Sequence, residues 1–76
     1  MPYKISPKGL NYPDREQATL TDLQRQVLEY LLYRSNEGYS DYLTSSEIGY
    51  DLKMHPRAIS GIAYSLHKKG LVDKKD

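Results

Sequence analysis

The amino-acid sequence predicts a small, mainly α-helical domain of three helices with a minimal two-stranded β-ribbon, preceded by an extended N-terminal arm. Three observations predict it. Apolar residues recur at helical spacing on both sides of a tight turn within residues 45–62, capping signals mark the same helices, and residues 1–19 carry three prolines and no sustained period. Because 76 residues can bury one modest core, we expect a single domain over residues 20–76, with 1–19 as its arm.

The first expected helix covers residues 21–34 and begins at a capping box formed by Thr21 and Gln24. Its apolar side chains cover an arc wider than the roughly 100° needed to face one core. Either the N-terminal arm folds back over the excess, or a second copy of the chain covers it in a homodimer through helix 21–34. The residues of this arc are Leu20, Leu23, Val27, Leu28, Leu31 and Leu32.

Residues 45–62 carry the pattern that two helices crossing at a tight turn require. Ile48 and Leu52 lie four residues apart on one helix face, and Gly49 beside them allows a second backbone to approach closely. Ile59 and Ile62 share a face of the following helix, so they can pack against the first helix across the crossing. Met54, in the turn, is expected to point inward.

Capping signals place the ends of these two helices independently. Thr44 and Glu47 form a second capping box, which begins the first helix of the pair. His55 followed by Pro56 suits a cap and first turn, because proline loses no hydrogen bond there. Gly70, which follows two lysines, suits the left-handed backbone conformation that commonly ends a helix.

These residues resemble a known superfamily. Residues 20–72 resemble the winged helix-turn-helix DNA-binding domains and are similar to small MarR-like regulators. The shared order of elements is a leading helix, a short strand at 39–43, the helix pair, and the sequence KKGLV at 68–72, which leads into the wing. The resemblance implies a three-helix winged helix-turn-helix fold and double-stranded DNA as the partner. Two features depart from the pattern: Lys53 occupies a turn position usually held by glycine, and only residues 73–76 follow the expected strand at Leu71 and Val72.

Charge is distributed unevenly along the chain. The net charge is only +1, but residues 1–52 carry a net charge of −3 and residues 53–76 a net charge of +4. The positive segment coincides with the second helix of the pair, which favours a contact with an anionic partner. Lys4 and Lys8 leave open a phosphate contact by the arm, although a packed or loose tail is the simpler interpretation.

The outward face of helix 56–69 carries side chains that suit a DNA major groove. Arg57, Gly61, Tyr64 and Lys68 are spaced by 4, 3 and 4 residues and form a stripe opposite the apolar face. Arg57 suits a base edge, and the later members suit the sugar-phosphate backbone. The expected DNA-binding residues are Ser45, Ser46, His55, Arg57, Ser60, Gly61, Tyr64, Lys68, Lys74 and Lys75.

We therefore expect a sequence-specific double-stranded DNA-binding protein, a small transcriptional regulator reading the major groove with helix 56–69. The alternative is a protein-interaction module, an adaptor or inhibitor, docking through helix 21–34 and the tyrosines. No catalytic constellation, cofactor or metal site is expected: cysteine is absent, and His55 and His67 have no arranged partners. With no signal peptide or membrane-spanning run in the sequence, a cytoplasmic location is expected.

Overall fold

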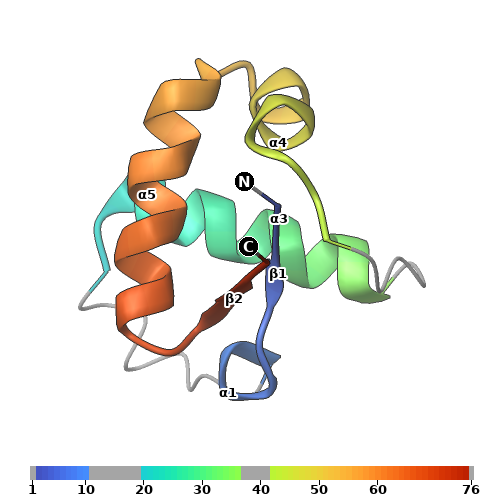
Figure 1. Cartoon of the computed structure of the whole chain (residues 1–76), viewed down its shortest axis with the longest axis vertical. Helices are drawn as coiled ribbons and strands as arrows, with labels where there is room; N and C mark the ends of the chain where they lie inside the picture. The colour runs from blue at the N-terminus through green and yellow to red at the C-terminus, as the bar shows by residue number, and fades with distance from the viewer. Residues whose placement is uncertain (1, 11–19, 37–41, 76) are drawn as a thin grey trace.

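The structure, a computed structural model, describes residues 2–10, 20–36 and 42–75, which form a mainly helical domain with a small antiparallel sheet (Figure 1). This confirms the expected fold class at the level of mainly helical architecture. None of the described helices is long and apolar enough to cross a membrane. The elements are β1 (Tyr3–Ile5), α1 (Pro7–Leu10), α3 (Asp22–Asn36), α4 (Ser45–Leu52), α5 (Pro56–Lys68) and β2 (Val72–Lys74).

The sheet is built from the two ends of the described chain. β1 pairs antiparallel with β2, with Tyr3 opposite Lys74 and Ile5 opposite Val72. On its other edge β1 forms an isolated bridge, in which the backbone N–H groups of Tyr3 and Leu43 each donate to the other residue's carbonyl at 2.7 Å. β1 therefore lies between Leu43 and β2.

This topology corrects the expected pairing of the strand at 39–43 with Leu71 and Val72. The strand beside Val72 comes from the segment assigned to the arm, and Leu43 pairs with the far edge of that strand. Residues 39–41 lie outside the described part of the chain. Three residues are too few to show a strand period, so the sequence pattern does not reveal β1.

The arm also contains a short helix, α1, which the prediction of an extended arm missed. Ser6 begins it, because its Oγ accepts a hydrogen bond from the Gly9 N–H at 3.1 Å. The same Oγ donates to the Gly70 carbonyl at 2.6 Å, and Lys8 Nζ donates to the Lys69 carbonyl at 3.2 Å. These bonds fasten the segment after β1 to the end of α5.

One hydrophobic core joins the helices to the sheet. Ile59, Ala63 and Leu66 on the inner face of α5 are fully buried, and Tyr3 and Ile5 of β1 belong to the same cluster. The N-terminal segment therefore covers the wide apolar arc, as one of the two alternatives expected. Of the arc, Leu20, Val27, Leu28 and Leu31 are buried and Leu32 is partly buried, whereas Leu23 stays 47% exposed.

The predicted capping interactions are present. Thr21 Oγ1 accepts from the Gln24 N–H at 3.1 Å, and the Thr21 N–H donates to Gln24 Oε1 at 2.9 Å. Thr44 and Glu47 make the same reciprocal pair at the start of α4. His55 Nδ1 accepts from the second residue of α5, which fixes the start of that helix. Short-range side-chain chemistry therefore sets where the three long helices begin.

The turn between α4 and α5 forces their backbones together. Lys53, at the turn position usually held by glycine, adopts the left-handed conformation with φ of 58°, and Met54 packs against the core. The Met54 N–H donates to the Gly49 carbonyl at 2.8 Å. A Cβ added to Gly49 would lie well inside van der Waals distance of the Met54 carbonyl oxygen, so the close approach needs glycine.

We predict that Gly49→Ala lowers the free energy of unfolding by about 1 to 3 kcal/mol, because the turn must move to admit the methyl group. Gly61→Ala is the matched control in the exposed interior of α5: no heavy atom lies within 4 Å of the added Cβ. That variant should gain about 1 kcal/mol, the difference in helix propensity between alanine and glycine. Urea unfolding of both variants measures the effects, and shifts of the same sign would contradict the prediction.

Candidate nucleic-acid interface

The outer face of α5 carries the predicted stripe of exposed residues. Arg57, Gly61, Tyr64 and Lys68 all lie on the surface, with Tyr64 48% exposed. Open space surrounds the Gly61 Cα, because nothing lies within 4 Å of an added Cβ. The stripe therefore has no side chain at Gly61, between the side chains of Arg57 and Tyr64.

A lysine from the sheet extends this face. Lys68 Nζ lies 5.3 Å and Lys74 Nζ 5.6 Å from the centroid of the Tyr64 ring. Both ammonium groups are within the range of a cation–π interaction. We call Tyr64, Lys68 and Lys74 the α5 cluster; it joins the outer face of α5 to the end of β2.

A second group of the same composition lies on the sheet. Lys4 Nζ is 5.0 Å and Lys75 Nζ 5.8 Å from the centroid of the Tyr42 ring. We call Lys4, Tyr42 and Lys75 the sheet cluster. Lys75 is one of the residues expected to bind DNA, and Lys4 is one of the two lysines of the arm for which a phosphate contact is left open.

Ser45 and Ser60 are brought together rather than presented to a partner. Ser45 is only 6% exposed, and its Oγ lies 2.7 Å from Ser60 Oγ in a hydrogen bond between α4 and α5. The expectation that Ser45 contacts DNA is therefore corrected, and the Ser60 hydroxyl already has a partner. Ser46 and His55 are exposed, although His55 Nδ1 is occupied by its capping bond to the Arg57 N–H at 3.0 Å.

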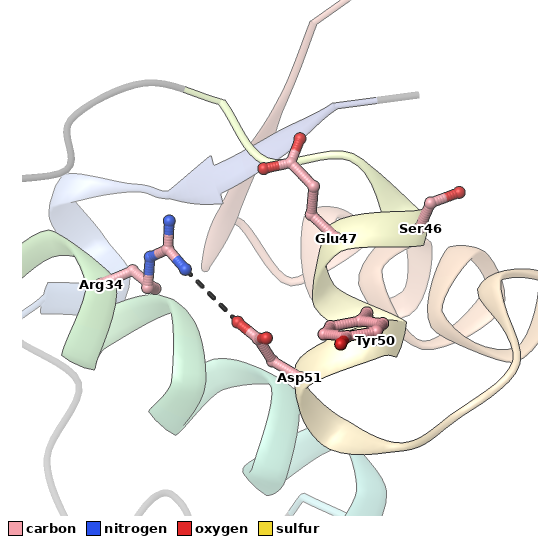
Figure 2. A pocket seen from close by; sticks show the side chains of 5 residues that line it. All are labelled: Arg34, Ser46, Glu47, Tyr50 and Asp51. Atoms are coloured by element: carbon pink, nitrogen blue, oxygen red, sulfur yellow. Dashed lines mark hydrogen bonds and ion pairs between the residues drawn. The ribbon is translucent and has the colours of Figure 1, made fainter.

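A pocket of about 360 Å³, lined by polar and charged residues, opens on the other side of α4, between this helix and the end of α3 (Figure 2). Figure 2 shows Asp51 pointing toward Arg34, and Arg34 Nη1 lies 3.3 Å from Asp51 Oδ2. Its lining residues are Arg34, Ser46, Glu47, Tyr50 and Asp51.

Tyr30 completes this polar group. Its hydroxyl donates to Asp51 Oδ2 and accepts from Arg34 Nη1 at 3.0 Å. Burial raises the pKa of Tyr30 above its usual value of 10.0, and the hydrogen bond to Asp51 raises it further. The polar groups bond to one another, so the network joins α3 to α4.

Acidic side chains are absent from the outer face of α5. Residues 56–68 contain no Asp or Glu, and the two ion pairs of the described residues, Asp22–Arg25 and Arg34–Asp51, both involve α3. Within the described chain, no lysine of either cluster forms an ion pair with a carboxylate. Asp73, next to Lys74 in β2, lies opposite Lys4 in the sheet register. Among the described residues, the interface therefore offers positive charge beside aromatic rings, with no ion pair to a carboxylate.

No protein-family model, curated protein or solved structure matches the chain.

We predict that Ser60→Ala lowers the free energy of unfolding by about 1 to 2 kcal/mol, because it leaves the buried Ser45 hydroxyl without its partner. The double variant Ser45→Ala with Ser60→Ala should be less destabilised than Ser60→Ala alone, since no buried donor is then left unpaired. Urea unfolding of both single variants and the double variant forms a double-mutant cycle. Additive losses would show that the two hydroxyls do not interact.

Proposed function

We propose that this protein binds double-stranded DNA sequence-specifically, as a small transcriptional regulator of the winged helix-turn-helix type. The observation that carries the proposal is the exposed, acid-free face of α5, which continues onto β2 where Lys68 and Lys74 share the Tyr64 ring. A helix with this face fits the major groove, and the lysines beside it suit phosphates.

Each residue of the stripe has a separate role in this proposal. Arg57, in the first turn of α5, reaches a base edge, where a guanidinium can donate two hydrogen bonds to guanine. Gly61 lets the groove approach the helix backbone, because no side chain fills the space there. Tyr64 and Lys68 contact the sugar-phosphate backbone. Ser46, exposed in the first turn of α4, is placed beside helix N–H groups that favour a phosphate.

The sheet supports the winged interpretation in an unexpected way. β1 pairs antiparallel with β2, in the place that the returning strand of a wing would take. Leu43 then pairs with the far edge of β1. In this proposal β1 and β2 together act as the wing, and β2 carries Lys74 to the side of α5.

Charge placement favours DNA over the adaptor alternative. Lys68 and Lys74 both lie beside the Tyr64 ring, as a continuous positive surface for DNA requires. A protein-interaction module would not require these charges to lie together. The apolar arc that an adaptor would use is largely covered by the N-terminal segment. A homodimer through α3 belongs to the DNA-binding proposal and would use Leu23 and Tyr33, which are 47% and 58% exposed.

Salt titration of binding to a mixed-sequence duplex, followed by selection of a preferred sequence, tests the proposal. Affinity should fall with salt with a log-log slope of about −0.9 per phosphate contact. On the selected sequence, Arg57→Ala should cost about 1 to 3 kcal/mol at one base position, and Lys68→Ala should weaken all sequences alike. Absence of duplex binding at low salt would refute the function, and equal losses for both variants would remove the base-reading role of Arg57.

Gly61 provides a test that separates binding from stability. Gly61→Leu should raise the free energy of unfolding by about 1 kcal/mol, because leucine is the better helix former and its Cβ has no heavy atom within 4 Å. The same side chain should weaken duplex binding, since it fills the space assigned to the groove. Gly61→Ala is the graded control, with the same direction of stability change and a smaller loss of affinity. Unchanged affinity of the leucine variant would show that nothing approaches the helix here.

A further inference from the structure

We infer that the outer face of α4 is a docking site for a partner protein that presents an arginine side chain. The site consists of the Glu47 carboxylate and the Tyr50 ring, which line the pocket between α3 and α4. The ligand class is a guanidinium group carried on a peptide. This site uses no residue of the α5 stripe and does not require DNA binding.

Tyr50 is the most exposed of the large hydrophobic side chains among the described residues. It is 86% exposed, whereas Tyr33, the next in order, is 58% exposed. Glu47 lies three residues before Tyr50, so the two side chains are neighbours on one face of the helix. Figure 2 shows them one above the other along α4, with the pair Arg34–Asp51 beside them. A group that enters the pocket therefore meets a carboxylate and an aromatic ring together.

Glu47 carries a negative charge that no cation of the described residues offsets. Its Oε1 accepts hydrogen bonds from the Thr44 N–H at 3.4 Å and from Thr44 Oγ1 at 3.2 Å. These bonds hold the carboxylate in place at the start of α4, but both donors are neutral. Among the described residues no lysine or arginine lies within ion-pair distance of this carboxylate. A cation is therefore the partner that this side chain favours.

The neighbouring polar network indicates which cation suits these groups. Arg34 Nη1 lies 3.3 Å from Asp51 Oδ2, and the Arg34 guanidinium carbon lies 5.8 Å from the centroid of the Tyr30 ring. Glu47 and Tyr50 present the same two chemical groups, a carboxylate and a tyrosine ring, on the outside of α4. Arginine suits them better than lysine, because a planar guanidinium can stack on a ring while it donates hydrogen bonds to a carboxylate.

Charge complementarity favours a protein segment over a nucleic acid at this pocket. Its lining residues carry two negative charges, on Glu47 and Asp51, and one positive charge, on Arg34. A phosphate in the pocket would face both carboxylates, whereas a basic side chain would be attracted. An exposed tyrosine is also a residue type that is enriched among the anchors of protein–protein interfaces. The occupant is therefore an arginine of a partner protein.

The test titrates the full chain, without DNA, with the capped tripeptide glycine–arginine–glycine at millimolar concentration. NMR should show saturable shifts of the Tyr50 ring and of the α4 backbone amides. The same peptide with citrulline in place of arginine, which has a similar shape and no charge, should bind more weakly.

Two substitutions in the site should weaken binding of the arginine peptide without unfolding α4. Glu47→Gln should weaken it about two- to fivefold, the range expected for an exposed ion pair. Glutamine can keep the capping box with Thr44, as Gln24 does with Thr21. Tyr50→Ala should also weaken binding about two- to fivefold, by loss of the cation–π contact, whereas Tyr50→Phe keeps the ring and should retain affinity.

Matched variants on α3 control for charge and for aromatic content. Asp22→Asn removes the same charge at the opposite end of α3 from Arg34, and Tyr33→Ala removes an exposed tyrosine that does not line the pocket. Both should keep the parent affinity, and circular dichroism checks that every variant is folded.

Several outcomes would overturn the inference. They are the absence of saturable shifts in α4, equal binding of the citrulline peptide, and a loss in Glu47→Gln no larger than the loss in Asp22→Asn. Tighter binding of spermidine than of the arginine peptide would make a free polyamine the ligand. Self-association of the parent chain that Glu47→Gln abolishes, measured by sedimentation velocity, would assign the arginine to a second copy of this chain instead of a partner protein.

Discussion

The pairing of β1 with β2 is the constraint on which the rest of the domain depends. It carries Tyr3 and Ile5 into the core, where they cover apolar surface of α3 that would otherwise face water. It also fixes the direction of β2, so that Lys74 reaches the Tyr64 ring on α5. Without this pairing the helices would keep their caps, but the core would be open and the positive surface would lose its sheet half.

The two sides of α5 have different surroundings. Ile59, Ala63 and Leu66 are completely buried on the inner side, whereas the outer side is exposed and Tyr64 there lies beside Lys68 and Lys74. Substitutions on the outer side should therefore have little effect on the packing of the core. Ser60 lies at the boundary, where its hydroxyl bonds to α4 rather than facing outward.

Sequence predicted the parts of this structure that depend on near neighbours. The capping boxes at Thr21 and Thr44 join residues three positions apart, and the close approach at Gly49 follows from one turn. β1 could not be predicted in the same way, because its partner is almost a whole chain length distant. The start of α1 carried a usable signal, since Ser6 before a proline repeats the cap-then-proline order found at α5. The burial of Ser45 could not be predicted from near neighbours, because it depends on how α4 crosses α5.

The distance in sequence between the paired strands also determines the order of folding. α3, α4 and α5 form their contacts within a continuous stretch of chain, whereas β1 meets β2 only when a long loop closes. Non-local pairing of this kind is slow, so we expect the sheet to form after the helices have packed. The sheet closes the core, so its opening exposes apolar surface even though the helices keep their own hydrogen bonds. A fluctuation that releases β1 would separate Lys4 from Tyr42, whereas Tyr64 and Lys68 would keep their places on α5.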